Sequence, residues 1–305
     1  MRIDRIGQIT DDFYVLGDPR LPVYFLDGPR PALFDSSQTP MARLHERAIK
    51  EVLGDRTPAF LFLTHSHFDH LGGAAHFKAV WPDMRILAAP RVGQVMTRPG
   101  AVRVMTELNA GALELLRAQG IEPLHEAPFA PFTLDGALED GQVVDLGNGT
   151  SVQAVAAPGH TWDFTSYWIA EKKILVASEA AGCDRGNGYI MTEFLVDYET
   201  YMNSLRRLAS FEAEVLCQGH GFVFTGPDAR THLERSMQQA AEYTAAMERM
   251  LVEEAGDIER VVERFKAMEL DDRIATAQSA APYILNTRAR AKTLWAKIQE
   301  DKGGD

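Results

Sequence analysis

The chain has few cysteines, no long apolar run and no excess of basic residues, and each lack argues against a class of protein. Its 305 residues include only Cys183 and Cys217, which excludes a disulfide framework and a thiolate zinc cluster. The first residues lack the apolar stretch of a signal peptide, and no run approaches a membrane span, so we expect a cytoplasmic protein with no membrane partner. A net charge of −12 argues against nucleic acid as a non-specific partner.

What the chain does contain is a run of metal-ligand residues at positions 64–73, THSHFDHLGG, directly after the apolar segment FLFL. The apolar segment predicts a short buried strand. His65 and His67 are two residues apart, so on an extended chain they point the same way. Asp69 and His70 fall on the turn into a helix, where a second set of directions opens. One short peptide can therefore face two adjacent divalent metal ions.

Hydrophobic periodicity predicts an α+β protein with a mixed sheet and helices outside it. Strands are expected at 9–16, 22–26, 31–35, 60–63, 85–89, 140–146, 151–156, 165–170, 173–177 and 214–217. Helices are expected at 39–53, from the metal motif to about 80, and at 91–119, 197–210, 228–255, 257–268 and 280–300, the last interrupted near Pro282. His45 lies on the first of these helices and is expected at the surface.

Three further ligand-type residues follow predicted strands. His160, Glu179 and His220 each lie just past a strand end, in the segments PGHT, SEA and QGHG. Open sheets place their functional sites at the ends of strands, in the loops that follow. We therefore predict that these residues join the metal motif.

The order and spacing of these motifs resemble the metallo-β-lactamase fold superfamily over roughly residues 9–225. The resemblance implies a four-layered αβ/βα sandwich with metals at one edge. The whole chain looks most similar to the quinolone-signal response thioesterase subgroup, in GQITDD at 7–12, LGD at 16–18, AVRV at 101–104 and a helical carboxyl-terminal part. We therefore expect a catalytic domain over 1–226, with a helical insertion at about 91–120. Residues 227–305 would form a helical extension that covers the site or forms the seam of a homodimer.

The resemblance also implies a ligand set for two divalent metal ions. One ion would be held by His65, His67 and His160, and the other by Asp69, His70 and His220. Glu179 stands where the superfamily usually has a bridging aspartate. Because glutamate is longer by one methylene, it either bridges from a backbone set farther back or binds one metal alone, and Asp184 could compete with it. Zinc, iron and manganese all remain open.

These residues predict a metal-dependent hydrolase that acts on a thioester or a related carbonyl ester of a small-molecule acyl substrate, through a metal-bound hydroxide. Asp69 would be the catalytic residue that orients the hydroxide and accepts its proton. The oxygen-reducing di-iron branch of the superfamily typically has glutamate at the position of His67, so histidine favours hydrolysis. The alternatives are a lactonase or phosphodiesterase on the same fold, a mononuclear iron oxygenase, and a catalytically weak regulatory or binding protein.

Overall fold

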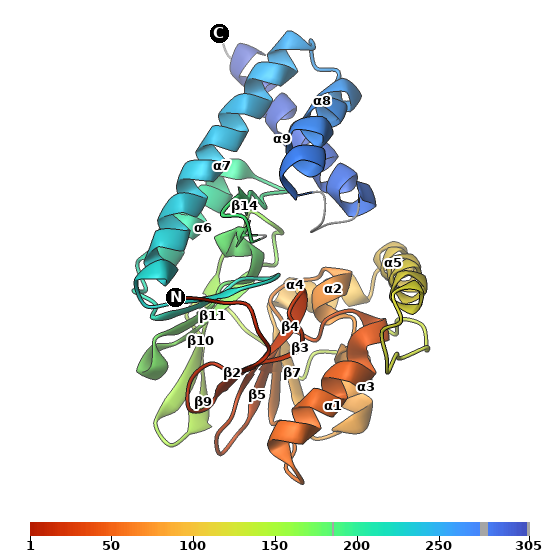
Figure 1. The fold of residues 1–305 in the computed structure, drawn as a ribbon, viewed down its shortest axis with the longest axis vertical. Helices are drawn as coiled ribbons and strands as arrows, with labels where there is room; N and C mark the ends of the chain where they lie inside the picture. Colours follow the sequence, from red (N-terminus) through yellow and green to blue (C-terminus); the bar gives the residue numbers. More distant parts are fainter. Residues whose placement is uncertain (185, 275–279, 304–305) are drawn as a thin grey trace.

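A computed structural model describes residues 1–184, 186–274 and 280–303 of the chain (Figure 1). Two seven-stranded sheets carry the fold. The first sheet consists, in spatial order, of β2 (Gly7–Gln8), β3 (Phe13–Asp18), β4 (Leu21–Leu26), β5 (Ala32–Phe34), β6 (Phe60–Phe62), β7 (Arg85–Ala88) and β8 (Gly136–Ala137). The second consists of β1 (Arg2–Ile3), β16 (Val223–Thr225), β15 (Val215–Cys217), β12 (Ile174–Val176), β11 (Thr165–Ile169), β10 (Thr150–Ala156) and β9 (Val143–Gly147). The short strands β13 (Cys183–Asp184) and β14 (Ile190–Met191) form a separate pair.

Helices cover the outer faces of both sheets, and a helical group extends beyond them at the carboxyl-terminal end (Figure 1). On the amino-terminal half these are η1 (Thr39–Met41), α1 (Ala42–Leu53), α2 (Phe68–Leu71), α3 (Ala74–Val80), α4 (Pro90–Met96) and α5 (Pro99–Ala118). On the other half they are η2 (Ala170–Lys172), η3 (Ser178–Ala181), α6 (Tyr198–Ala209), α7 (Pro227–Glu253), α8 (Ile258–Phe265), η4 (Lys266–Ile274) and α9 (Ala280–Gly303). None of the helices in the described ranges combines the length and apolarity needed to span a membrane.

The alternation of side chains along β6 explains the layering. Phe60 and Phe62 point toward the second sheet, where Phe62 packs against Tyr167 with ring centroids 5.2 Å apart. Leu61 lies between them in sequence and packs on the opposite face, among residues of α1 and α3. Because both faces of the strand are buried, its sequence is a continuous apolar run. Another group of buried apolar side chains, which includes Leu216, lies between the second sheet and the helices α6 and α7. The order of layers is therefore helix, sheet, sheet, helix.

Parallel pairing brings the carboxyl ends of four strands to one edge of the sandwich. β5 pairs with β6, and β12 pairs with β15, each in parallel. Hydrogen bonds join the sheets at this edge. The amide of Thr165 donates to the carbonyl of Thr64 at 2.8 Å, the hydroxyl of Tyr167 donates to the carbonyl of Leu63 at 2.6 Å, and the hydroxyl of Tyr24 donates to the carbonyl of Gln218 at 2.5 Å. The loops that follow these strands therefore meet in a fixed arrangement.

Several sequence predictions differ from the structure. The helix expected at 91–119 is two helices, α4 and α5, because Pro99 restricts the preceding residue to an extended conformation and the helix ends before it. The strand expected from residue 9 begins at Phe13, because residues 9–12 form a turn in which the amide of Ile9 donates to the carbonyl of Phe13. α9 runs without a break through Pro282, which lies in the first turn, where a missing amide hydrogen costs no helical bond. His45 is fully buried rather than at the surface, because its ring fills the space beside Gly17.

Candidate metal centre

The structure brings all seven predicted ligands together at the edge where the four strands end. Their ligand atoms form three overlapping groups in which every atom lies within 4.8 Å of the others. The groups are His65, His67 and His160; His65, His70 and Glu179; and Asp69, His70 and His220. The residues span 156 positions of the sequence, from 65 to 220, so only the fold can account for their convergence.

The local backbone explains how one peptide serves two clusters. The chain is extended as far as His67, which has φ −83° and ψ 147°, and α2 begins at the next residue. The rings of His65 and His67 therefore lie close together, with centroids 4.5 Å apart. Asp69 and His70 are on the helical turn and face the second cluster. This arrangement is the one that the spacing of the motif predicts.

The first cluster consists of the imidazoles of His65, His67 and His160, of which His65 and His160 are buried and His67 is partly buried. Nε2 of His160 lies 3.1 Å from Nδ1 of His67. Nε2 of His65 is buried and has no hydrogen-bond partner in the part of the chain that the structure describes. Burial lowers the pKa of His65 well below its ordinary value, and burial together with His67 lowers the pKa of His160 to about 3. Neutral imidazoles whose nitrogens lie within 4.8 Å of one another fit a divalent cation, because a ligand nitrogen must carry a lone pair and no proton.

The second cluster gathers around the carboxylate of Glu179. Its Oε1 lies 2.6 Å from Nε2 of His70 and 2.9 Å from Nε2 of His220. Burial alone would raise the pKa of Glu179, but its imidazole neighbours, His70 first among them, hold the pKa well below its ordinary value. Burial alone would lower the pKa of His70, but Glu179 and then Asp35 raise it well above its ordinary value. The proton that His70 carries in the absence of metal compensates the negative charge of Glu179 and Asp35. A divalent cation bound here would supply positive charge in its place.

Three acceptors behind the histidines direct the free nitrogens into the site. Nδ1 of His70 lies 2.8 Å from Oδ2 of Asp35, and Nδ1 of His220 lies 3.0 Å from the carbonyl oxygen of Arg20. Nδ1 of His160 donates to the carbonyl oxygen of Glu193 at 2.5 Å. A hydrogen on Nδ1 leaves the lone pair on Nε2, so each ring presents a ligand atom to the site. Sequence analysis missed these supporting residues.

One of the missed residues had a signal in the sequence. Asp35 follows β5 directly, and β5 is the parallel neighbour of β6, which carries the metal motif. Its carboxylate also accepts hydrogen bonds from the amide and hydroxyl of Thr64, at 2.8 Å and 2.9 Å. A carboxylate at the end of a strand adjacent to the motif strand could have been picked out. The carbonyl groups of Arg20 and Glu193 have no such signal, because any residue provides a carbonyl.

The position of Glu179 explains how a longer side chain fits. The residue lies on η3, beyond the end of β12 at Val176, and is buried. Its Oε2 accepts a hydrogen bond from the hydroxyl of Ser178 at 2.6 Å and lies 4.0 Å from Nδ1 of His65. The carboxylate therefore faces both clusters. Asp184 joins neither of them, because its Oδ1 accepts from the amides of Gly186 and Gly188, at 2.7 Å and 3.3 Å.

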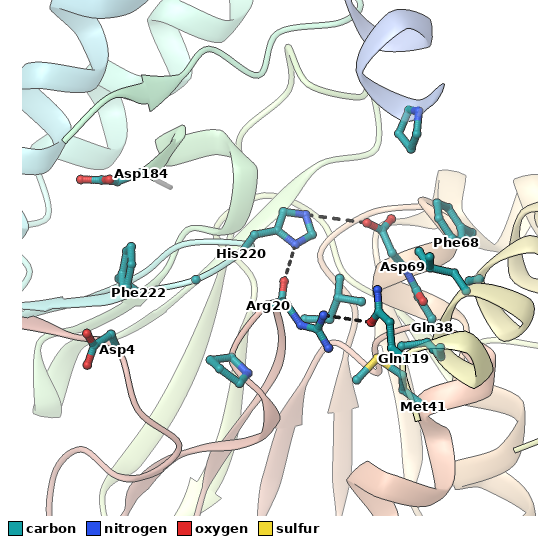
Figure 2. Close-up of a pocket in the computed structure, with 17 residues that line it drawn as sticks. Asp4, Arg20, Gln38, Met41, Phe68, Asp69, Gln119, Asp184, His220 and Phe222 are labelled. Atoms are coloured by element: carbon teal, nitrogen blue, oxygen red, sulfur yellow. Dashed lines mark hydrogen bonds and ion pairs between the residues drawn. The ribbon is translucent and has the colours of Figure 1, made fainter. Parts of the chain in front are cut away.

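A cavity of about 450 Å³ opens beside the second cluster, and Asp69 and His220 form part of its wall (Figure 2). Most of the remaining wall is apolar. Its apolar residues on the amino-terminal half and on α9 come from the start of β4, from η1, α2 and α5, and from α9: Leu21, Met41, Phe68, Ala112, Leu115, Leu116 and Pro282. A small molecule with an apolar part can therefore place a polar group next to Asp69.

Known proteins resemble this chain over most of its length. A family model described as the metallo-beta-lactamase superfamily matches residues 22–220. The "Atrochrysone carboxyl ACP thioesterase" of Aspergillus fumigatus is 25% identical over 75% of this chain and 56% of its own length. The "Probable metallo-hydrolase YflN" of Bacillus subtilis is 25% identical over 57% of this chain and 68% of its own length. The chain thus spans between about half and two thirds of these relatives.

The fold has close counterparts among solved structures. The metallo-beta-lactamase family protein TTHA1429 from Thermus thermophilus superposes with a TM-score of 0.64, at 18% identity, over 97% of this chain and 95% of its own. The layered architecture expected from the sequence is therefore confirmed. The metallo-beta-lactamase fold typically binds divalent metals, and the donors described above fit that requirement. The chain belongs to the metallo-beta-lactamase superfamily, whose members are generally hydrolases.

Proposed function

We propose that this protein hydrolyses small acyl thioesters at a centre that holds two divalent cations. The observation that supports the proposal most is the convergence of seven donor groups beside an apolar cavity. The resemblance to a protein named as a thioesterase favours the thioester among carbonyl esters. The proposed ions are zinc or iron, with manganese as the third choice.

Each donor group has a proposed task. His65, His67 and His160 would hold one cation, and Asp69, His70 and His220 would hold the other. Glu179 lies between the two clusters and would help to hold both cations. When bound, the cations lower the pKa of a water molecule and polarise the substrate carbonyl. Asp69, at the cavity wall, orients that water and receives its proton.

The charge on the cavity wall argues for a carbonyl substrate over a phosphodiester. Among the described residues that line the cavity, Arg20 is the one arginine or lysine. Its guanidinium is already paired with Asp18, with Nη2 2.6 Å from Oδ2, and Nη1 donates to Gln119 at 3.2 Å. Phosphate recognition uses cationic groups that are free to make bidentate contacts. The wall instead suits the apolar part of an acyl group.

Metal content and a substrate panel test the proposal. Protein purified without chelator is expected to contain two divalent ions per chain, and to hydrolyse acyl thioesters faster than lactones or phosphodiesters. Asp69→Asn is expected to lower kcat by roughly a hundredfold or more, because it removes the proton acceptor. Asp140→Asn is the control, because Asp140 pairs with Arg207 on the surface, 2.8 Å away. This variant is expected to keep full activity.

Other outcomes would identify the rival functions. One iron per chain together with oxygen consumption would contradict hydrolysis and indicate an oxygenase. Absence of turnover across the whole panel, with metal present, would indicate a binding or regulatory protein. Faster cleavage of lactones or phosphodiesters than of thioesters would retain the metal centre and replace the substrate class.

A further inference from the structure

The helix at the carboxyl-terminal end is joined to the metal centre by a buried arginine. Arg290 of α9 is fully buried. Its Nη2 lies 3.0 Å from Oε2 of Glu193, and its Nε donates to the carbonyl oxygen of Phe194 at 3.1 Å. The guanidinium also lies over the ring of Tyr243, 5.6 Å from its centroid. Taking a guanidinium out of water is costly unless its hydrogens find acceptors, and here the planar fork engages two consecutive residues.

Those two residues begin the segment that supports His160. The carbonyl oxygen of Glu193 accepts the hydrogen bond from Nδ1 of His160. On one side of this segment the amides of Leu195 and Val196 donate to the carbonyl of Gly159, at 3.0 Å and 3.1 Å. From α9, Arg290 holds residues 193 and 194. The hydroxyl of Thr293 adds a hydrogen bond to the carbonyl of Leu195 at 3.3 Å.

We propose that Arg290 is a positioning residue for the metal ligand His160, so that α9 is a structural part of the metal centre. The guanidinium holds the side chain of Glu193 and the carbonyl of Phe194, and so fixes the backbone from which the carbonyl of Glu193 reaches His160. That carbonyl fixes the ring orientation and tautomer of His160. Loss of a group that orients a metal ligand typically weakens metal binding ten- to a hundredfold. The effect of altering Arg290 should therefore fall on the cluster that contains His160, and leave the cluster around His220 intact.

The matched test compares two single variants, in each of which one arginine of α9 is replaced by lysine. Arg290→Lys keeps the positive charge and most of the volume, but one ammonium cannot reproduce the two-pronged contact with residues 193 and 194. Arg288→Lys is the control, because the guanidinium of Arg288 pairs with Glu259, 2.6 Å away, and Glu259 is not one of the predicted ligands. Zn²⁺ is titrated into metal-free protein against a chromophoric chelator. Arg290→Lys is expected to bind one equivalent of Zn²⁺ about ten- to a hundredfold more weakly. Arg288→Lys is expected to match the unaltered protein.

A spectroscopic measurement separates positioning from general stability. Co²⁺ bound in place of Zn²⁺ reports the geometry of its ligands through its visible absorption. If Arg290 positions His160, Arg290→Lys is expected to change the Co²⁺ absorption band of one site. If Arg290 only stabilises the fold, the variant would have a lower melting temperature and an unchanged band. Unchanged Zn²⁺ affinity and an unchanged Co²⁺ band in folded Arg290→Lys would overturn the inference.

The inference rests on the proposed metal centre, but the two can fail separately. If the unaltered protein binds no Zn²⁺, the proposed function fails. If it binds Zn²⁺ and Arg290→Lys binds it equally well, only the role of Arg290 fails. Should Arg290→Lys not fold, Glu193→Gln takes its place in the same titration, because it keeps the shape of the side chain and removes the charge that Arg290 engages. Weaker binding of one Zn²⁺ by Glu193→Gln would support the inference, and unchanged binding would contradict it.

Discussion

The carboxylate of Glu179 occupies the space in which a Cβ atom on residue 219 would lie. A Cβ built on Gly219 would be 2.4 Å from Oε1 and 2.8 Å from Oε2 of Glu179. Real atoms do not approach so closely, so the carboxylate of Glu179 can take this position only because residue 219 is glycine. The extra methylene of Glu179 is thus accommodated by the loop that follows the neighbouring strand β15, directly before the ligand His220.

Gly219→Ala is therefore expected to damage the metal centre. The new methyl group would push the carboxylate away from His70 and His220, and Zn²⁺ binding should weaken at least about tenfold, as for other disturbed ligand contacts. Gly100→Ala is the control, because a Cβ on Gly100 of α5 meets no atom within 4 Å. Competitive Zn²⁺ titration measures both variants. Equal affinity in the two would show that the carboxylate has room to move.

Shortening the acid tests the same contact from the other side. Glu179→Asp draws the carboxylate back by about 1.5 Å, one carbon–carbon bond, so its contacts with His70 and His220 should be lost. We expect a lower content of the second metal and a lower rate of thioester hydrolysis. Adding Gly219→Ala to Glu179→Asp should cost less than Gly219→Ala alone, because the shorter side chain clears the methyl group. An unchanged metal count and rate in Glu179→Asp would remove Glu179 from the ligand set.

The apolar wall of the cavity should set the preference for acyl length. Leu115 lines the cavity and is 52% exposed, so a charge can be placed there without unfolding α5. Leu115→Glu is expected to lower kcat/KM for an octanoyl thioester about tenfold, the effect of losing roughly 1.4 kcal/mol of apolar contact, and to spare an acetyl thioester. Leu108→Glu is the control on the same helix, outside the cavity wall and 37% exposed. Equal losses for both thioesters, or for both variants, would count against an acyl site here.

A buried histidine remote from the predicted ligands should make stability depend on pH. Burial lowers the pKa of His45 to about 4, although Asp18 opposes the shift, and both ring nitrogens lack a hydrogen-bond partner in the described part of the chain. In the unfolded chain its pKa is near 6.5, so below that pH the unfolded state binds a proton that the folded state does not. As the pH falls from 7.5 to 5, this difference in proton binding lowers the free energy of unfolding by about 2 kcal/mol.

His45→Leu is expected to remove that part of the pH dependence. Urea unfolding of both proteins at pH 7.5 and pH 5 measures it, and the unaltered protein should lose about 2 kcal/mol more than the variant. His232 has a pKa lowered to about 4 by burial as well, but it is present in both proteins and its contribution cancels. Parallel losses in the two proteins would show that His45 does not stay neutral in the folded state.

The sequence could predict those features whose physical cause lies within a few residues. The continuous apolar run FLFL marks a strand buried on both faces, and β6 is that strand. Asp197 precedes an amphipathic segment and caps α6 by accepting a hydrogen bond from the amide of Thr200. The surface placement expected for His45 was wrong because amphipathic periodicity assigns a face to each residue, whereas burial at its edge depends on what packs there, in this case the bare backbone of Gly17.

The sequence by itself determined which residues are available as ligands and the two directions in which the motif at 64–73 presents them, because both follow from residue type and from the change of extended chain to helix. Only the tertiary structure decided what supports those ligands. The contact between Arg290 and Glu193 joins positions 97 residues apart, and the gap that Gly219 leaves for Glu179 exists only where β12 and β15 lie in parallel. No local pattern encodes such contacts, because their partners are fixed by how the strands pair and how the helices pack.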